Sequence, residues 1–352
     1  MATDVSFAIP GDIDTPTGGY AYDRRLIAEL ERAGWSIAHL AWSPSFPFPD
    51  TIDKYLAAKS LAVLADDSLV LIDGLAYGAL PELAEAEGRR LGLVALVHHP
   101  LALETGLAPA AATRLADSER RALAMGRAVI ATSATTAETL MRDYGVPAER
   151  LQVARPGSEP APPARGAAGE TGVLHLLSVG TVTLRKGHDL LVEALARIAD
   201  LPWRCTIAGS LERDRDIVAD IRRRIARHGL EPRVQLLGAP PDLAPLYDSA
   251  DVFVLASRHE GYGMVFAEAL QHGLPIVATL AGAVPESVPA SSALLVPPDD
   301  VAALAEALGR LIANSALRRQ LAAGARASAL LLPSWRDTAR TVAEVLKRVA
   351  AV

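Results

Sequence analysis

Short apolar runs alternate with longer segments of helical period along most of this chain. Five runs lie in the first half, at residues 5–9, 36–42, 69–73, 93–99 and 128–133. A second series follows at residues 174–180, 203–209, 234–238, 252–257 and 275–279. Because buried strands that alternate with helices are typical of βα units around a parallel sheet, the sequence predicts two α/β domains.

The length of the chain agrees with this division, because 352 residues exceed the size at which one hydrophobic core usually keeps growing. Residues 1–155 are expected to form the first domain and residues 171–332 the second. The stretch between them, 156–170, is rich in Pro, Gly and Ala and is predicted to be a linker. Residues 333–352 form a predicted helix that packs back on the first domain.

Composition excludes several classes of protein. No apolar run approaches the roughly 20 residues that span a bilayer. The N-terminus lacks a basic stretch followed by an apolar one, so we expect no signal peptide and a cytoplasmic location. The single cysteine, Cys205, rules out an internal disulfide and a cysteine metal cluster, and is expected in a buried strand.

The charge distribution argues against a nucleic-acid partner. The net charge is -6, and residues 1–155 carry 14 basic and 20 acidic side chains. An acidic first domain also does not favour association with anionic membranes. Against this, the loop that contains Trp42, Phe46 and Phe48 could contact lipid or an apolar acceptor.

Residues 257–275 carry the pattern with the most chemical content. Glu260 and Glu268 lie eight residues apart, and a helix is expected to start near Met264. Gly261 and Gly263 allow close approach of the backbone, and the first helical turn offers N–H groups to a phosphate. Carboxylates suit sugar or ribose hydroxyls. By spacing alone, two unremarkable surface glutamates are an equally good interpretation.

The segment EGYGMVFAEALQHGLPIVAT, with its Glu-x7-Glu spacing, resembles the retaining glycosyltransferases of family four. The resemblance continues in the family's order through residues 178–195, 207–210, 248–257, 281–288 and 294–300, and covers most of 174–330. It implies the GT-B fold, in which two Rossmann-like domains place parallel sheets on an interdomain cleft.

The resemblance also implies roles for residues of the second domain. Arg185 and Lys186 would neutralise the donor diphosphate, although Thr181 stands where the family often has Arg. Glu260 would contact the transferred sugar and Glu268 the ribose. The remaining donor-binding residues implied are Gly261, Tyr262, Gly263, Met264 and Val265.

In the first domain the resemblance is weaker. Gly18 and Gly19 would contact the diphosphate from a Gly-rich loop. His98 or His99 would touch the donor sugar, and since adjacent strand residues point to opposite sides only one is expected to do so, with His98 preferred. Glu104 could line the acceptor side.

The function that the resemblance implies is transfer of a sugar from a UDP- or GDP-linked donor to an acceptor hydroxyl, with retention of configuration. No metal and no cofactor are expected; the pairs Asp12/Asp14 and Asp214/Asp216 are interpreted as structural. The sequence does not identify the acceptor. Two alternatives stay open: a sugar-nucleotide 2-epimerase of the same fold, and a two-domain sugar-binding protein without catalysis.

Overall fold

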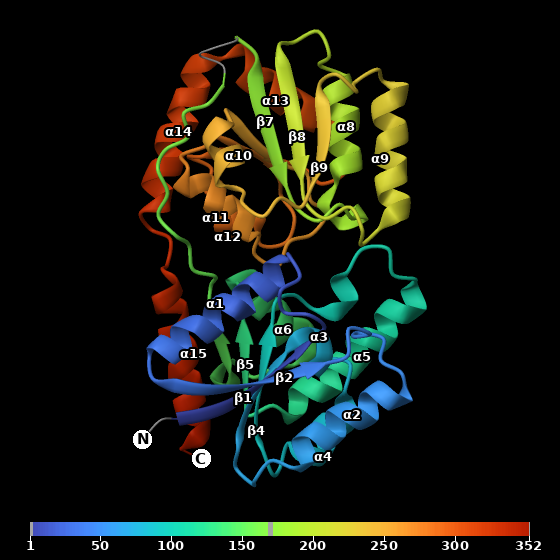
Figure 1. The fold of residues 1–352 in the computed structure, drawn as a ribbon, viewed down its shortest axis with the longest axis vertical. Coiled ribbons are helices and arrows are strands. Elements are labelled where there is room, and N and C mark those ends of the chain that lie inside the picture. Colours follow the sequence, from blue (N-terminus) through green and yellow to red (C-terminus); the bar gives the residue numbers. More distant parts are fainter. Residues whose placement is uncertain (1–2, 168–171, 352) are drawn as a thin grey trace. The chain divides into compact units, whose positions relative to one another are not determined.

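The computed structural model describes residues 3–167 and 172–351, and the chain divides into two compact units (Figure 1). One unit comprises the residues up to Gly157 together with those from Pro333 onward. The other comprises Ser158–Leu332. Each unit is described by itself below.

The first unit is built on a parallel sheet with the strand order β2-β1-β3-β4-β5-β6. Its strands are β1 Thr3–Pro10, β2 Trp35–Trp42, β3 Leu69–Asp73, β4 Gly92–Val97, β5 Ala128–Ala131 and β6 Leu151–Val153. Its helices are α1 Gly18–Arg32, α2 Thr51–Ala62, α3 Gly74–Tyr77, α4 Pro81–Glu87, α5 Pro109–Met125, α6 Ala134–Tyr144 and α15 Trp335–Ala350, with the 3₁₀ turns η1 Leu101–Leu103 and η2 Ala148–Arg150.

The second unit is built on a parallel sheet with the order β12-β11-β10-β7-β8-β9. Its strands are β7 Leu174–Val179, β8 Trp203–Ala208, β9 Val234–Gly238, β10 Val252–Leu255, β11 Ile276–Thr279 and β12 Ala293–Val296. Its helices are α8 His188–Ala196, α9 Arg215–Arg227, α10 Ala244–Ser249, α11 Met264–Gln271, α12 Val284–Ser287, α13 Val301–Ala313 and α14 Ser315–Ala329, with the 3₁₀ turn η3 Leu184–Lys186.

Both sheets are doubly wound, which confirms the predicted α/β class, and each of the ten predicted runs contains a strand. The order of strands reverses between β1 and β3 in the first sheet, and between β7 and β10 in the second. In open parallel sheets, ligands bind outside the carboxyl ends of the strands at this switch point. The fold therefore singles out the loops after β1 and β3, and after β7 and β10.

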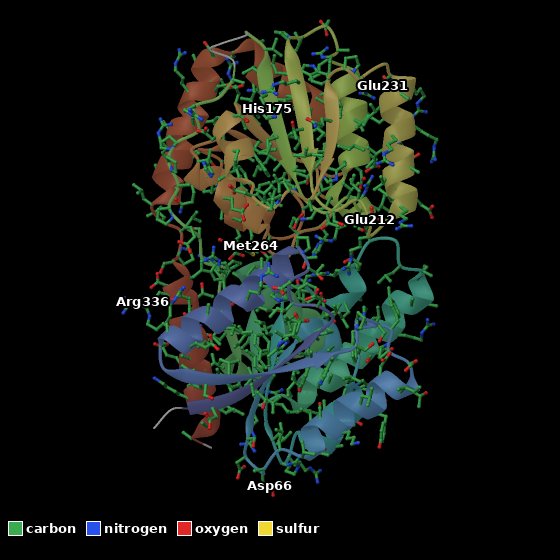
Figure 2. All side chains as sticks on the ribbon, viewed as in Figure 1. Asp66, His175, Glu212, Glu231, Met264 and Arg336 are labelled. Atoms are coloured by element: carbon green, nitrogen blue, oxygen red, sulfur yellow. The ribbon has the colours of Figure 1, made fainter. Side chains whose placement is uncertain are left out.

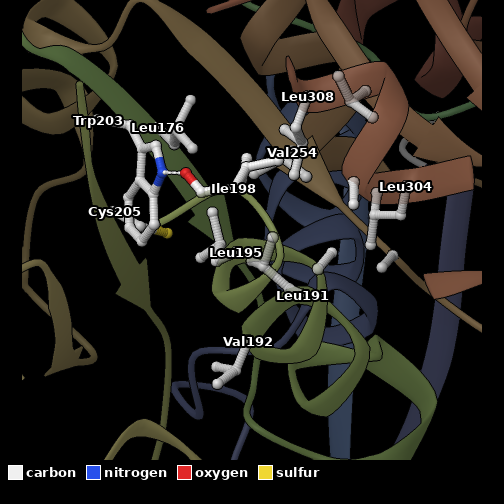
Figure 3. Close-up of a cluster of buried hydrophobic side chains, with 14 of the residues drawn as sticks. Leu176, Leu191, Val192, Leu195, Ile198, Trp203, Cys205, Val254, Leu304 and Leu308 are labelled. Atoms are coloured by element: carbon white, nitrogen blue, oxygen red, sulfur yellow. Dashed lines mark hydrogen bonds between the residues drawn. The ribbon is translucent and has the colours of Figure 1, made fainter. Parts of the chain in front are cut away.

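Helix α8 packs on the second sheet through a cluster of buried aliphatic side chains (Figure 3). Leu191 and Leu195 of α8 are fully buried there, beside Trp203 of β8. The indole of Trp203 donates a 2.7 Å hydrogen bond to the carbonyl of Ile198, so its one polar atom is satisfied. Cys205 is buried in β8, as the sequence predicts.

Helix α15 packs within the first unit although it is the last element of the chain. A capping box of Ser334 and Asp337 starts the helix. Trp335 then meets Tyr22 of α1 edge to face, with ring centroids 5.5 Å apart. The Thr338 hydroxyl donates a 2.7 Å hydrogen bond to the Arg155 carbonyl. These contacts join the end of the chain to α1 and to the segment after β6.

Part of the predicted linker is held on the second unit. The backbone N–H of Ala164 donates to the His272 carbonyl at 2.8 Å, and that of Gly166 donates to the Asp248 carbonyl at 3.0 Å. Arg165 pairs with the Asp248 carboxylate. Residues 168–170 of the predicted linker lie outside the described residues.

The short path from β7 to α8 depends on Gly187, and this can be tested. Gly187 has a φ of +66°, and a Cβ there would lie 1.9 Å from the Ala256 carbonyl oxygen. Gly229 has a φ of +63° with nothing within 4 Å of the same position. We expect Gly229→Ala to cost about 1 kcal/mol of unfolding free energy from backbone strain alone, and Gly187→Ala to cost several times more. Denaturant unfolding of both variants tests this, and equal losses would contradict the close approach.

Candidate functional site

Glu260 is the centre of a buried charge cluster in the second unit. It lies in the loop between β10 and α11, and its side chain is 5 % exposed. Lys186, in the turn after β7, donates a 2.7 Å hydrogen bond from Nζ to Glu260 Oε1, and Ser257 Oγ donates to the same oxygen at 2.5 Å. Arg185 Nη1 reaches Oε2 at 3.4 Å. Two cations and one carboxylate thus meet at the β7/β10 switch point.

This cluster fixes the charge of Glu260. Burial by itself would raise the pKa of this carboxyl, but the charges of Lys186 and Arg185, with hydrogen bonds from Lys186 and Ser257, outweigh burial and lower the pKa to about 2. Glu260 is therefore an anion at neutral pH, and the three groups together carry a net charge of about +1. A site of this sign suits an anionic ligand.

Arg258 connects the same two loops, the one after β7 and the one after β10. Its guanidinium makes two 2.9 Å hydrogen bonds to the Asp189 carboxylate and one of 2.6 Å to the Leu184 carbonyl. Its backbone N–H donates to the Arg185 carbonyl at 2.7 Å. Because a bidentate guanidinium pair has a fixed geometry, Arg258 ties the segment that carries Arg185 and Lys186 to the loop that carries Glu260.

Helix α11 begins at Met264, as the sequence predicts (Figure 2). Gly263 caps it with a φ of +83°, and no side chain caps the helix. The N–H groups of Met264 and Val265 therefore belong to a helix end of the kind that binds phosphate groups. Gly261 and Tyr262 precede this turn, and the Tyr262 side chain is buried.

Glu268 lies one turn inside α11 and is half-buried. The Tyr247 hydroxyl donates a 2.7 Å hydrogen bond to its Oε2. Burial and the charge of Glu268 raise the pKa of Tyr247 well above its usual value, so the hydroxyl stays a donor. Tyr247 also stacks on His272, with ring centroids 5.0 Å apart. The Tyr247 hydroxyl thus orients one oxygen of the Glu268 carboxylate.

A buried histidine adjoins the charge cluster. His188, the first residue of α8, is 1 % exposed, and neither ring nitrogen has a hydrogen-bond partner in the described parts of the chain. Burial first, and the charge of Lys186 second, lower its pKa to about 4. His188 is therefore neutral and adds no charge to the site.

The first unit holds a second cluster at its own switch point. His98 follows β4, and its Nε2 lies 3.3 Å from Asp23 Oδ1 on α1 and 3.4 Å from Asp73 Oδ2 at the end of β3. Burial alone would lower the pKa of His98, but the two carboxylates outweigh it and raise the pKa to about 10. Burial raises the pKa of Asp23 as well, to about 7, and Asp73 adds to this against the opposing charge of His98.

The same three side chains have the composition of a metal site. One donor atom from each lies within 4.8 Å of the other two, and this is the one such group of three among residues 3–167 and 172–351. The predicted absence of a metal stays a prediction.

The sequence also predicts Gly18, Gly19 and His99 as site residues of the first unit. Gly18 and Gly19 form the first turn of α1, behind the cap residue Thr17, and not a loop as predicted. The Thr17 hydroxyl accepts a hydrogen bond from the Tyr20 N–H, which starts the helix early. His99 points to Glu104, with Nε2 3.5 Å from Oε2, whereas His98 points to Asp23 and Asp73.

Sequence reasoning missed several residues of both clusters. In the second unit these are Ser257, Arg258, Asp189, His188 and Tyr247, and in the first unit Asp23 and Asp73. Asp73 had a usable signal, because it ends the apolar run LVLID at the edge where parallel sheets bind ligands. Asp23 had none, because one aspartate in an amphipathic helix is usually a surface residue.

Two family models match the chain. Residues 174–314 match the model for "Glycosyl transferases group 1", and residues 42–161 match the model for "Glycosyltransferase Family 4". Two doubly wound parallel sheets with polar clusters at both switch points define the GT-B class. Within that class, the chain belongs to the family-four glycosyltransferases.

The chain is also similar in sequence to individual curated proteins, in each case over part of its length. A D-inositol 3-phosphate glycosyltransferase of Xylanimonas cellulosilytica is 32% identical over 241 residues, which is 63% of this chain and 57% of the relative. The chain spans about half the length of the first curated relatives that it matches.

Among solved structures, sucrose-phosphate synthase from Thermosynechococcus elongatus superposes with a TM-score of 0.82 at 21% identity, over 99% of both chains. Anabaena Alr3699/HepE in complex with UDP and glucose gives a TM-score of 0.78 at 21% identity, over 98% of this chain and 100% of that one. These likenesses establish the shared fold.

The depressed pKa of Glu260 predicts how stability depends on pH. A carboxyl whose pKa falls from 4.5 to about 2 on folding contributes stability above pH 4.5 and loses it as the pH falls toward 2. We expect the stability difference between wild type and Glu260→Gln to shrink by about 2 kcal/mol between pH 7 and pH 3. Glu212→Gln, at a side chain that is 74 % exposed, is the control. A pH-independent difference in chemical unfolding would contradict the ion pairing.

Proposed function

We propose that the protein transfers a sugar from a nucleoside-diphosphate sugar, UDP- or GDP-linked, to an acceptor hydroxyl, with retention of anomeric configuration. The observation that carries the proposal is the cluster of Glu260 with Lys186 and Arg185 at the β7/β10 switch point. Its net positive charge lies where this class of sheet binds nucleotides.

The donor diphosphate is assigned to Arg185, Lys186 and the first turn of α11, from Gly261 to Val265. Two side-chain cations and a helix N-terminus stabilise the negative charge that grows on the leaving diphosphate as the glycosidic bond breaks. Glu260 holds both cations in place before the donor binds. Gly18 and Gly19, at the N-terminus of α1, are assigned a further phosphate contact.

The ribose and the sugar are assigned to carboxylates and to a histidine. Glu268 accepts hydrogen bonds from the ribose hydroxyls while Tyr247 fixes its second oxygen. Glu260 and His98 are assigned to the transferred sugar, and His99 with Glu104 to its surroundings. The acceptor hydroxyl attacks from the face that the diphosphate leaves, and a diphosphate oxygen takes its proton.

Metal independence and a cytoplasmic location remain part of the proposal. The diphosphate charge is assigned to protein cations, so the chemistry requires no ion. In the described parts of the chain, no helix is long and apolar enough to cross a membrane. Phe48 and three apolar residues of α2 are exposed, but the acidic first unit still argues against anionic membranes.

A transfer assay tests the proposal. UDP- and GDP-sugars are incubated with D-inositol 3-phosphate, on which the Xylanimonas relative acts, and with a panel of sugar acceptors. We expect an α-linked product from an α-linked donor, and Lys186→Ala should slow turnover by about 30- to 1,000-fold, the range for losing one group that stabilises the developing charge.

Lys59→Ala, on the exposed face of α2, and a reaction with excess EDTA are the controls; both should leave transfer intact. An epimerised donor formed without acceptor would identify the 2-epimerase instead. Binding of donors without turnover of any acceptor would identify a sugar-binding protein.

Nucleotide binding should separate the two glutamates. Glu268→Gln keeps the shape but removes the charge that attracts the ribose hydroxyls, so we expect affinity for UDP or GDP to fall about tenfold or more. Glu260→Gln should change nucleotide affinity far less, because the ligand assigned to Glu260 is the sugar, which the free nucleotide lacks. Calorimetry with both nucleotides measures these affinities.

Glu231→Gln, at an exposed position on the same unit, controls for the loss of a carboxylate (Figure 2). Unchanged affinity in Glu268→Gln would remove the ribose assignment. If only Glu260→Gln lowered nucleotide affinity, the ribose would be assigned to Glu260 and the sugar to Glu268.

A further inference from the structure

The cluster of Asp23, Asp73 and His98 lies where the first sheet reverses its strand order. Asp73 ends β3, Asp23 follows β1 on α1, and His98 follows β4. These three side chains therefore meet at the carboxyl edge of the sheet, where ligands of doubly wound folds bind.

The His98 ring contacts three side chains of the first unit. Nε2 faces the two carboxylates at 3.3 and 3.4 Å. Tyr22 packs against the ring edge to face, with centroids 5.2 Å apart, and a Cβ at Gly19 would lie at ordinary van der Waals distance, 3.5 Å, from His98 Cδ2. The side chain is 22 % exposed, and its contacts with the two aspartates are made by Nε2, so Nδ1 is the other nitrogen that could donate to a ligand.

The burial of two carboxylates around one histidine is costly. Asp23 is fully buried and Asp73 is 5 % exposed, and Asp23 Oδ2 has no hydrogen-bond partner within the described chain. Apolar residues of similar volume fill an interior as well or better, so packing alone does not account for the carboxylates. Their shared feature is contact with the same nitrogen of His98.

We propose that Asp23 and Asp73 are positioning residues that fix the His98 ring, with Nδ1–H directed at a hydroxyl of the transferred sugar. Asp73 is itself oriented, because its Oδ1 accepts a 2.6 Å hydrogen bond from the Leu75 N–H at the start of α3. With both carboxylates facing Nε2, a protonated ring has Nδ1–H as its second donor. The inference rests on the proposed glycosyltransferase function, which supplies the sugar.

Nitrogen-15 NMR of the imidazole groups in the full-length protein tests the geometry without any turnover. We expect the Nε2–H proton of His98 to be protected from exchange with water, and to be assigned by its loss in His98→Gln. Asp73→Asn should shift it upfield or abolish it. Asp66→Asn, an exposed aspartate of the same unit, should leave it unchanged (Figure 2).

Kinetics test whether the two aspartates act through His98. Asp23→Asn and Asp73→Asn should each lower kcat by about ten- to a hundredfold, the value of one charged hydrogen bond, with little change in KM for the donor. In the His98→Gln background the same substitutions should cost nothing further. Additive losses would overturn the proposal, since the aspartates would then act independently of the histidine.

Two other results would also overturn it. An Nε2 signal that exchanges like that of the exposed His39 would show that the ring is not held. Tight binding of Zn²⁺ or Mn²⁺ to the wild type, lost in Asp73→Asn, would show a metal centre in place of a hydrogen-bonded ring. If Asp23→Asn fails to fold, Asp73→Asn and the wild-type spectrum decide the question. If the wild type transfers no sugar, the proposed function fails while the NMR result still reports whether the ring is held.

Discussion

The ion pair between Lys186 and Glu260 is the interaction on which the switch-point site of the second unit depends. It joins the loop after β7 to the loop after β10, at a separation of 2.7 Å and with little exposure of either side chain. A buried carboxylate with no partner would cost several kcal/mol, so each loop stabilises the other only when both are in place. The ion pair between Arg258 and Asp189 also joins the loop after β10 to the segment that follows β7.

This pairing changes how the two glutamates of the Glu-x7-Glu spacing are understood. Glu268 accepts a hydrogen bond from a neutral phenol, whereas Glu260 is engaged with two cations. The partners of Glu260 come from the segment after β7, which the spacing of the two glutamates in the sequence does not express.

The fold could be predicted from the sequence because each central strand is buried on both faces and forms a continuous apolar run. The edge strands β6 and β12 were missed: Leu151–Val153 is only half-buried, and Ala293–Val296 is short and half-buried in its centre. The start of α11 at Met264 followed from its glycines. Gly18 and Gly19 were placed in a loop because of the family resemblance, whereas the Thr17 cap starts the helix at Gly18.

The site residues that escaped prediction are those whose role comes from contacts distant in sequence. Asp23 is ordinary in its own segment, and only the strand order brings it together with Asp73 and with the predicted His98. The two clusters also differ in sign: two cations share one carboxylate in the second unit, and two carboxylates share one imidazole in the first. A net positive site suits a diphosphate, and a charged ring donor suits hydroxyl oxygens.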